Sequence, residues 1–172
     1  NCSKRTALGQ RFRQIIQARP GRVLVELDYS AFHAMMLGRE AQSKAYMDLS
    51  ACDPHSWFAS YLVGKPVDYS VYERNPQEFK DRLREIKAEF GIVRDFQAKP
   101  ALLGIGLGLQ RRKLYWLNRA QEINGQLVGI PNEKTAKKLI GMLKELRPEL
   151  FTYQERIKDL AIRKACLMNE WG

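Results

Sequence analysis

Asp28 stands where a carboxylate could bind a metal ion. It directly follows the apolar run Val-Leu-Val-Glu-Leu at positions 23–27, which comes after the turn signal Pro20-Gly21 and predicts a β-strand. From Ser30 onward the spacing of apolar residues predicts a helix. A carboxylate between a strand and a helix is held by a fixed backbone and projects where ligands can approach. A strand-terminal Asp is also a common helix cap or turn former, so this residue alone leaves both interpretations open.

Lys99, Leu103 and Leu107 are spaced four residues apart, so a helix would place them on one stripe. Leucines at this spacing are also typical of a buried helix face, and the sequence leaves that alternative open. Arg94 lies five residues before Lys99, and a straight helix would rotate it by about 140° from the stripe. Pro100 removes one backbone donor and favours a kink, which could either bring Arg94 back to the stripe or disrupt it.

Capping residues and apolar periodicity predict about six helices around these positions. The predicted helices start near Ser30, at Asp53-Pro54 and at Pro76, and two more lie at 134–146 and 148–168. Gly38 is expected to end the first of these helices. The polar stretch 69–75 predicts a loop, and residues 11–16 a second strand.

The composition favours a folded chain with an anionic partner. The 172 residues are 45% hydrophobic, and the net charge of +10 is concentrated in residues 1–22 and 94–119. Nucleic acid is the first explanation for such charge and an anionic membrane surface the second. A solvated basic face without a partner is the alternative to both. Three widely spaced cysteines argue against a disulfide framework and favour a reducing compartment. The longest weakly polar run, 100–109, is about half the roughly 20 residues that a membrane span needs.

Several motifs follow one another in a fixed order. They are Gly-Gln-Arg-Phe-Arg at 9–13, the strand leading into Asp28-Tyr29-Ser30, Asp-Pro-His at 53–55, and Ala98-Lys99 with Gly104 and Gly108. This order resembles the palm and fingers of family A DNA polymerases, the DNA polymerase I type. In that family a similar strand leads into motif A, a helix follows, and motif B lies on the fingers helix. The resemblance spans residues 9–172, and the order of the motifs is more specific than any one of them.

The resemblance implies nucleotidyl transfer from a dNTP to a primer 3′ end, with two Mg²⁺ ions as cofactors. Asp28 would be the catalytic carboxylate and a metal ligand, and the Tyr29 carbonyl would be a further ligand. Lys99 would meet the dNTP phosphates as a compact point charge. The resemblance also assigns Arg94, Leu103, Leu107 and His33 to the dNTP, and Arg11 and Arg13 to DNA.

Several positions depart from the motifs of the family. His33 stands where motif A has a Glu that closes the pocket against a ribose 2′-hydroxyl, so the sugar gate is expected to differ. A histidine packed into its surroundings is the equal alternative. Leu103 and Leu107 replace two aromatic positions of motif B, and Asp95 stands where its Arg is expected. His55 matches the family's D-x-H position, where we expect a structural role.

We therefore expect an α+β fold that is predominantly helical, with a partial palm of short antiparallel strands and the helical fingers subdomain of a right-hand polymerase. The expected parts are the partial palm at 1–64, the fingers at 65–147 and a helix returning toward the palm at 148–172. Motif C, with the second catalytic carboxylate, has no counterpart in the sequence, so we expect a partial polymerase that is inactive alone.

The expected partners are primer-template DNA, dNTP and the rest of a polymerase chain with motif C, the thumb and an exonuclease domain. No membrane partner is expected, and the location would be the cytoplasm of a bacterial or phage-infected cell. The alternative function is a non-catalytic, basic helical nucleic-acid-binding module, or a degenerate relative of the polymerases.

Overall fold

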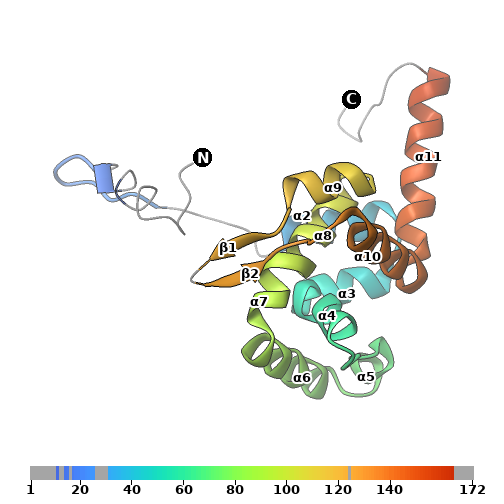
Figure 1. Cartoon of the computed structure of the whole chain (residues 1–172), viewed down its shortest axis with the longest axis horizontal. Coiled ribbons are helices and arrows are strands. Elements are labelled where there is room, and N and C mark those ends of the chain that lie inside the picture. Colours follow the sequence, from blue (N-terminus) through green and yellow to red (C-terminus); the bar gives the residue numbers. More distant parts are fainter. Residues whose placement is uncertain (1–10, 12–13, 16, 26–30, 124, 165–172) are drawn as a thin grey trace.

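The computed structural model describes residues 11, 14–15, 17–25, 31–123 and 125–164. Within them the chain is mostly helical and has one two-stranded antiparallel sheet (Figure 1), which agrees with a predominantly helical α+β fold. The elements are α2 (Phe32–Glu40), α3 (Lys44–Cys52), α4 (Pro54–Leu62), α5 (Tyr69–Arg74), α6 (Pro76–Glu89), α7 (Gly91–Val93), the π-helical turn η1 (Arg94–Ala98), α8 (Lys99–Gly106), α9 (Arg111–Leu117), β1 (Gln121–Ile123), β2 (Gln126–Val128), α10 (Glu133–Leu146) and α11 (Pro148–Lys164). None of these described helices is long and apolar enough to cross a membrane.

Side-chain caps explain where five of the described helices begin. Asp53 accepts a hydrogen bond from the Ser56 N–H at 3.1 Å, and Pro54 occupies the first turn of α4. Asn75 and Pro76 start α6 in the same way. The other capping side chains are those of Ser43, Asp68 and Asn132. The predicted helix starts at Asp53-Pro54 and at Pro76 are therefore confirmed.

Two predictions about helices were wrong. Residues 69–75, expected to form a loop, contain α5, because Asp68 caps its first turn and Val71 packs into the core. Gly38, expected to end a helix, lies inside α2. A Cβ atom at Gly38 would stand 3.0 Å from Met47 Cγ, so the glycine permits the close approach of α2 and α3. In both places packing outweighs the local composition.

The predicted strands do not form in the part of the chain that the structure describes. Residues 23–25 have no strand conformation and are exposed, and residues 11, 14 and 15 are helical. A strand needs a partner for its backbone hydrogen bonds, and the described residues provide none for these segments. The sheet forms instead between β1 and β2, where Gln121 pairs with Val128. The Asn124-Gly125 dipeptide is the sequence signal for this hairpin, and Gly125 has a φ of 75°.

Helix α4 lies at the centre of the hydrophobic core and packs against α6, η1 and α8. Its Trp57 and Phe58 side chains are almost completely buried. The apolar face of α6, predicted from spacings of three and four residues, contributes Phe79, Leu83 and Ile86. The same buried cluster extends through α10 to Leu150 of α11. The core therefore joins residues on both sides of the expected boundaries near 64 and 147.

Candidate functional site

The stripe formed by Lys99, Leu103 and Leu107 lies on the exposed side of α8 and at its C-terminal end. Leu103 is 38% exposed and Leu107 is 70% exposed, whereas Leu102 and Ile105 of the same segment are buried in the core. The alternative that these two leucines belong to a buried helix face is therefore excluded. Exposed leucines grouped beside a cation form a surface to which a ligand can bind.

A cavity of about 330 Å³ runs along this stripe. Lys99 and Asp95 supply charged groups to its wall, and Leu103, Leu107 and Leu117 supply apolar surface. Small-molecule sites typically combine apolar walls with a few polar groups in a volume of this order. The cavity can hold an anionic group near Lys99 and an apolar group or a ring along the leucines. The carboxylate of Asp95 offsets part of the positive charge that Lys99 brings to the cavity.

The helix widens by one residue immediately before α8. In η1 the Lys99 N–H donates to the Arg94 carbonyl, five residues back in the chain. Pro100 follows and has no N–H to donate, and a wide turn leaves room for its ring. Because one π turn joins Arg94 to Lys99, the rotation of about 140° expected of a straight α-helix does not apply.

The Arg94 guanidinium is held by α4. Its Nε and Nη2 donate to Asp53 Oδ2 at 3.1 and 3.0 Å, and Nε also donates to Ser56 Oγ at 3.0 Å. Its Nη1 donates to Asp95, which lines the cavity. Arg94 thus joins η1 to α4 next to the cavity. The contact between Arg94 and a dNTP stays a prediction.

Asp53, predicted only as a helix start, is the residue that holds Arg94. Burial by itself raises the pKa of the Asp53 carboxyl, but the hydrogen bonds from Ser56 and the charge of Arg94 outweigh it and keep this pKa below its ordinary value. The capping role has a local sequence signal in the Asp-Pro dipeptide. The pairing with Arg94, 41 positions away, has none.

Two residues from other helices meet the C-terminal end of α8. His33 of α2 packs on Gly106, where an added Cβ atom would stand 2.9 Å from His33 Cε1. Gln154 of α11 donates from Nε2 to the Ile105 carbonyl at 2.6 Å and to the Gly106 carbonyl at 3.3 Å. His33 therefore lies at the same end of α8 as Leu107. Gln154, in a helix where the sequence indicated no site, satisfies carbonyls that a helix end leaves free.

His55 is largely buried beside Asp53, in agreement with the structural role expected for it. Its Nδ1 lies 3.7 Å from Asp53 Oδ1. Burial lowers the pKa of His55 to about 4, and the charge of Asp53 offsets only part of that effect. The imidazole is therefore neutral near pH 7.

The remaining predicted site residues belong to the N-terminal part of the chain. Asp28, Tyr29 and Arg13 lie outside the described residues, so their metal and DNA contacts stay predictions. Arg11 is exposed. Among the described residues, no group of three or more His, Cys, Asp and Glu side chains could hold a metal ion.

A second exposed surface lies on α9, which the sequence indicated only as basic. Trp116 is 54% exposed, and the Arg119 guanidinium lies 5.7 Å from the centroid of its ring. Trp116, Arg112, Lys113 and Leu107 line a cavity of about 550 Å³. Leu107 also lines the α8 cavity, so the two surfaces adjoin. The basic stretch therefore carries exposed apolar and aromatic groups as well as charge.

No family model, curated protein or solved structure matches this chain. The resemblance to family A polymerases accordingly depends on the order of the sequence motifs. What the structure adds is a predominantly helical α+β fold, the exposure of the α8 stripe and the cavity beside it.

Proposed function

We propose that the chain is the palm and fingers part of a template-directed DNA polymerase of the family A type, and that the α8 stripe binds the incoming dNTP. The observation that carries the proposal is the exposure of Leu103 and Leu107 in line with Lys99, beside a cavity of about 330 Å³. A helix stripe that served only to pack the core would be buried. The motif order supports the reaction class, and the exposed stripe supports the location of the nucleotide.

In this proposal Lys99 holds the triphosphate, because an ammonium group is a compact donor to phosphate oxygens. Leu103 and Leu107 face the sugar and the base, and His33 lies at the Leu107 end of the helix. Arg94 braces η1 against α4 through Asp53 and would reach the triphosphate only by leaving that carboxylate.

The N-terminal residues complete the proposal, and of these Asp28, Tyr29 and Arg13 lie outside the described part of the chain. Asp28 and the Tyr29 carbonyl would hold magnesium, which supplies positive charge to the reacting phosphates when bound. Arg11 and Arg13 would contact the DNA backbone. Motif C of the same polymerase would supply the second carboxylate. The division into a partial palm at 1–64, fingers at 65–147 and a returning helix at 148–172 belongs to the same proposal.

Titration of the chain with a fluorescent dATP analogue in the presence of Mg²⁺ tests the nucleotide site. Lys99→Met should weaken binding by about tenfold or more, since a hydrogen bond to a charged group is worth about 1.5–3 kcal/mol. Lys134→Met removes an exposed lysine from α10 and should change the affinity by less than about twofold. Unlabelled dATP should displace the analogue, and deoxyadenosine should not.

Equal affinities of Lys99→Met and the unaltered chain would show that the stripe is not the phosphate site. The catalytic part of the proposal needs the complete polymerase. There Asp28→Ala should abolish primer extension, and retained extension would rule out Asp28 as a metal ligand.

A non-catalytic nucleic-acid-binding module is the second candidate, and the α9 surface favours it. Exposed aromatic rings beside cations bind single strands through base stacking and phosphate contacts. Trp116→Ala should then weaken binding of a fluorescent single-stranded oligonucleotide by about tenfold. Leu127→Ala, which also changes an exposed apolar residue, should leave it unchanged. Binding that depends on Trp116 in a chain that binds no dNTP would favour this candidate over a polymerase.

A further inference from the structure

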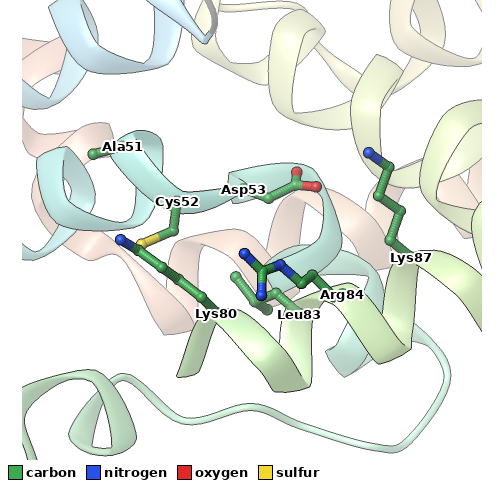
Figure 2. Close-up of a pocket in the computed structure, with 7 residues that line it drawn as sticks. All are labelled: Ala51, Cys52, Asp53, Lys80, Leu83, Arg84 and Lys87. Carbon is green, nitrogen blue, oxygen red and sulfur yellow. The ribbon is translucent and has the colours of Figure 1, made fainter. Parts of the chain in front are cut away.

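A basic groove lies between α6 and the turn that connects α3 to α4. Its volume is about 290 Å³, and its walls include Cys52, Asp53, Lys80, Arg84 and Lys87. Figure 2 shows Lys80 and Arg84 reaching from α6 toward the turn, with Lys87 further along the same helix. Of the described residues that line this groove, none lines the α8 cavity. The groove is therefore a separate feature of the surface.

The three cations of the groove follow one stripe of α6, because they are four and three residues apart. Arg84 donates to Asp81 at 2.6 Å. Arg82, which points to another side of the helix, pairs with Glu78. Lys80 and Lys87 have no carboxylate partner among the described residues. Their two ammonium groups are thus open to an anion.

Asp53, the one carboxylate among the residues that line the groove, does not cancel this charge. It accepts hydrogen bonds from Ser56 Oγ at 2.8 Å and from Arg94 Nη2 at 3.0 Å. Arg94, which also pairs with Asp95, therefore compensates part of the Asp53 charge. The groove is left with a net positive wall, to which Leu83 adds apolar surface.

We propose that this groove binds a phosphate group. Lys80 and Lys87 supply compact charges along α6 that suit phosphate oxygens. The Arg84 guanidinium between them pairs with Asp81 through Nη1 and has further N–H donors that a phosphate can use. The phosphate can belong to a nucleic-acid backbone or to a small phosphorylated molecule, since both present the same oxygens. The proposal does not depend on the function proposed for α8.

Titration of the ¹⁵N-labelled chain with inorganic phosphate, followed by NMR, tests the groove. Amide signals of α6 and of the α3–α4 turn should shift. The double variant Lys80→Gln/Lys87→Gln should weaken the affinity for phosphate by about tenfold or more. Lys80→Arg/Lys87→Arg keeps both charges and should retain binding. Circular dichroism checks that each variant keeps its helix content.

Lys137→Gln/Lys144→Gln is the matched control. It also removes two exposed lysines seven residues apart from a helix of 14 residues, and it should change the phosphate affinity by less than about twofold. Equal losses in the groove and control variants would overturn the proposal, as would the absence of phosphate binding by the unaltered chain.

A fluorescent single-stranded oligonucleotide and inorganic pyrophosphate distinguish the two sources of the phosphate group. Weaker oligonucleotide binding by Lys80→Gln/Lys87→Gln would assign the groove to a nucleic-acid backbone. Weaker pyrophosphate binding with unchanged oligonucleotide binding would assign it to a small phosphorylated ligand. Unchanged binding of both probes would contradict the proposal.

Discussion

Asp53 makes three contacts through one carboxylate and joins α4 to η1. It caps α4 through Ser56, pairs with Arg94 of η1 and lies beside His55. The side chains of Asp53 and Arg94 are only 20% and 16% exposed. Removing Asp53 would leave the Arg94 charge, which is shielded from water, with Asp95 as its carboxylate partner. The residue is therefore expected to matter more for stability than an ordinary surface carboxylate.

Asp53→Ala should lower the free energy of unfolding by about 2–3 kcal/mol, because it removes the cap of α4 and one of the two carboxylate partners of Arg94. Asp53→Asn keeps a capping side chain and should cost about 1 kcal/mol less. Asp68→Ala is the matched control: Asp68 is an exposed cap of α5, and its loss should cost about 1 kcal/mol. Urea unfolding measures all three variants. Similar losses for Asp53→Ala and Asp68→Ala would show that the pair with Arg94 adds no stability.

The buried His55 should make stability depend on pH. Its pKa of about 4 in the folded chain lies below the ordinary value of 6.5, so the unfolded chain binds a proton first as the pH falls. The free energy of unfolding should be constant above about pH 6.5 and should fall between there and about pH 4, by up to about 3 kcal/mol. The lowered pKa of Asp53 adds a further loss only at still lower pH, as that carboxylate becomes protonated.

Thermal unfolding at a series of pH values from 7 to 4 measures this dependence. His55→Gln removes the imidazole at this position, so the stability of the variant should vary less with pH than that of the unaltered chain. If both proteins lose stability equally between pH 6.5 and 4, His55 is not the group responsible.

Helix α8 combines a weak helical sequence with tight packing. Glycines generally destabilise a helix, but a Cβ atom at Gly104 would stand 2.7 Å from Leu114 Cδ1. Leu114 is fully buried and comes from α9. Gly104 thus allows α9 to pack closely on α8, which holds the stripe at the edge of the cavity.

Gly104→Ala should lower the free energy of unfolding by about 1–2 kcal/mol, because overpacking at Leu114 outweighs the gain in helix propensity. Gly141→Ala is the matched control in α10, where an added Cβ atom meets nothing within 4 Å. That variant should raise the free energy of unfolding by about 0.5–1 kcal/mol. Urea unfolding compares them, and a stabilising effect of Gly104→Ala would contradict the packing of α8 on α9.

The elements that sequence reasoning predicted well have local signals. Asp53-Pro54 and Pro76 mark helix starts because cap and first turn are neighbours in the chain. The apolar face of α6 follows from its periodicity. The apolar run at 23–27 is typical of a strand, but a strand also needs a partner, which no local pattern supplies. The prediction of a loop at 69–75 was wrong because Asp68 caps a helix there, α5.

At the scale of the whole molecule, the candidate site depends on contacts between distant segments. The stripe through Lys99 could be predicted from spacing alone, and its exposure could not, because exposure depends on where α4 and α9 pack. The same holds for the bond from Gln154 to the Ile105 carbonyl, which joins residues 49 positions apart. The Arg94–Asp53 pair is another such contact. The charge and the motif order therefore indicate which residues belong to the candidate site. The packing of distant segments determines which of these residues line its cavity.

The continuous core predicts that the described body, residues 31–164, unfolds as one cooperative unit. Buried side chains from α3 to α11 form a single cluster, so the described helices share one core. Urea unfolding followed by circular dichroism and by tryptophan fluorescence should give coincident curves with one midpoint. Two separate transitions would show that the expected parts at 1–64 and 65–147 unfold independently.

If the exposed stripe of α8 binds the dNTP, as we propose, it recognises the phosphates of the nucleotide. NMR titration of the ¹⁵N-labelled chain with dATP and Mg²⁺, compared with deoxyadenosine, tests this recognition. Addition of dATP should shift the amide signals of Lys99, Leu103 and Leu107, and deoxyadenosine, without phosphates, should leave them in place. Shifts confined to α6, or an α8 stripe that responds to neither compound, would contradict it.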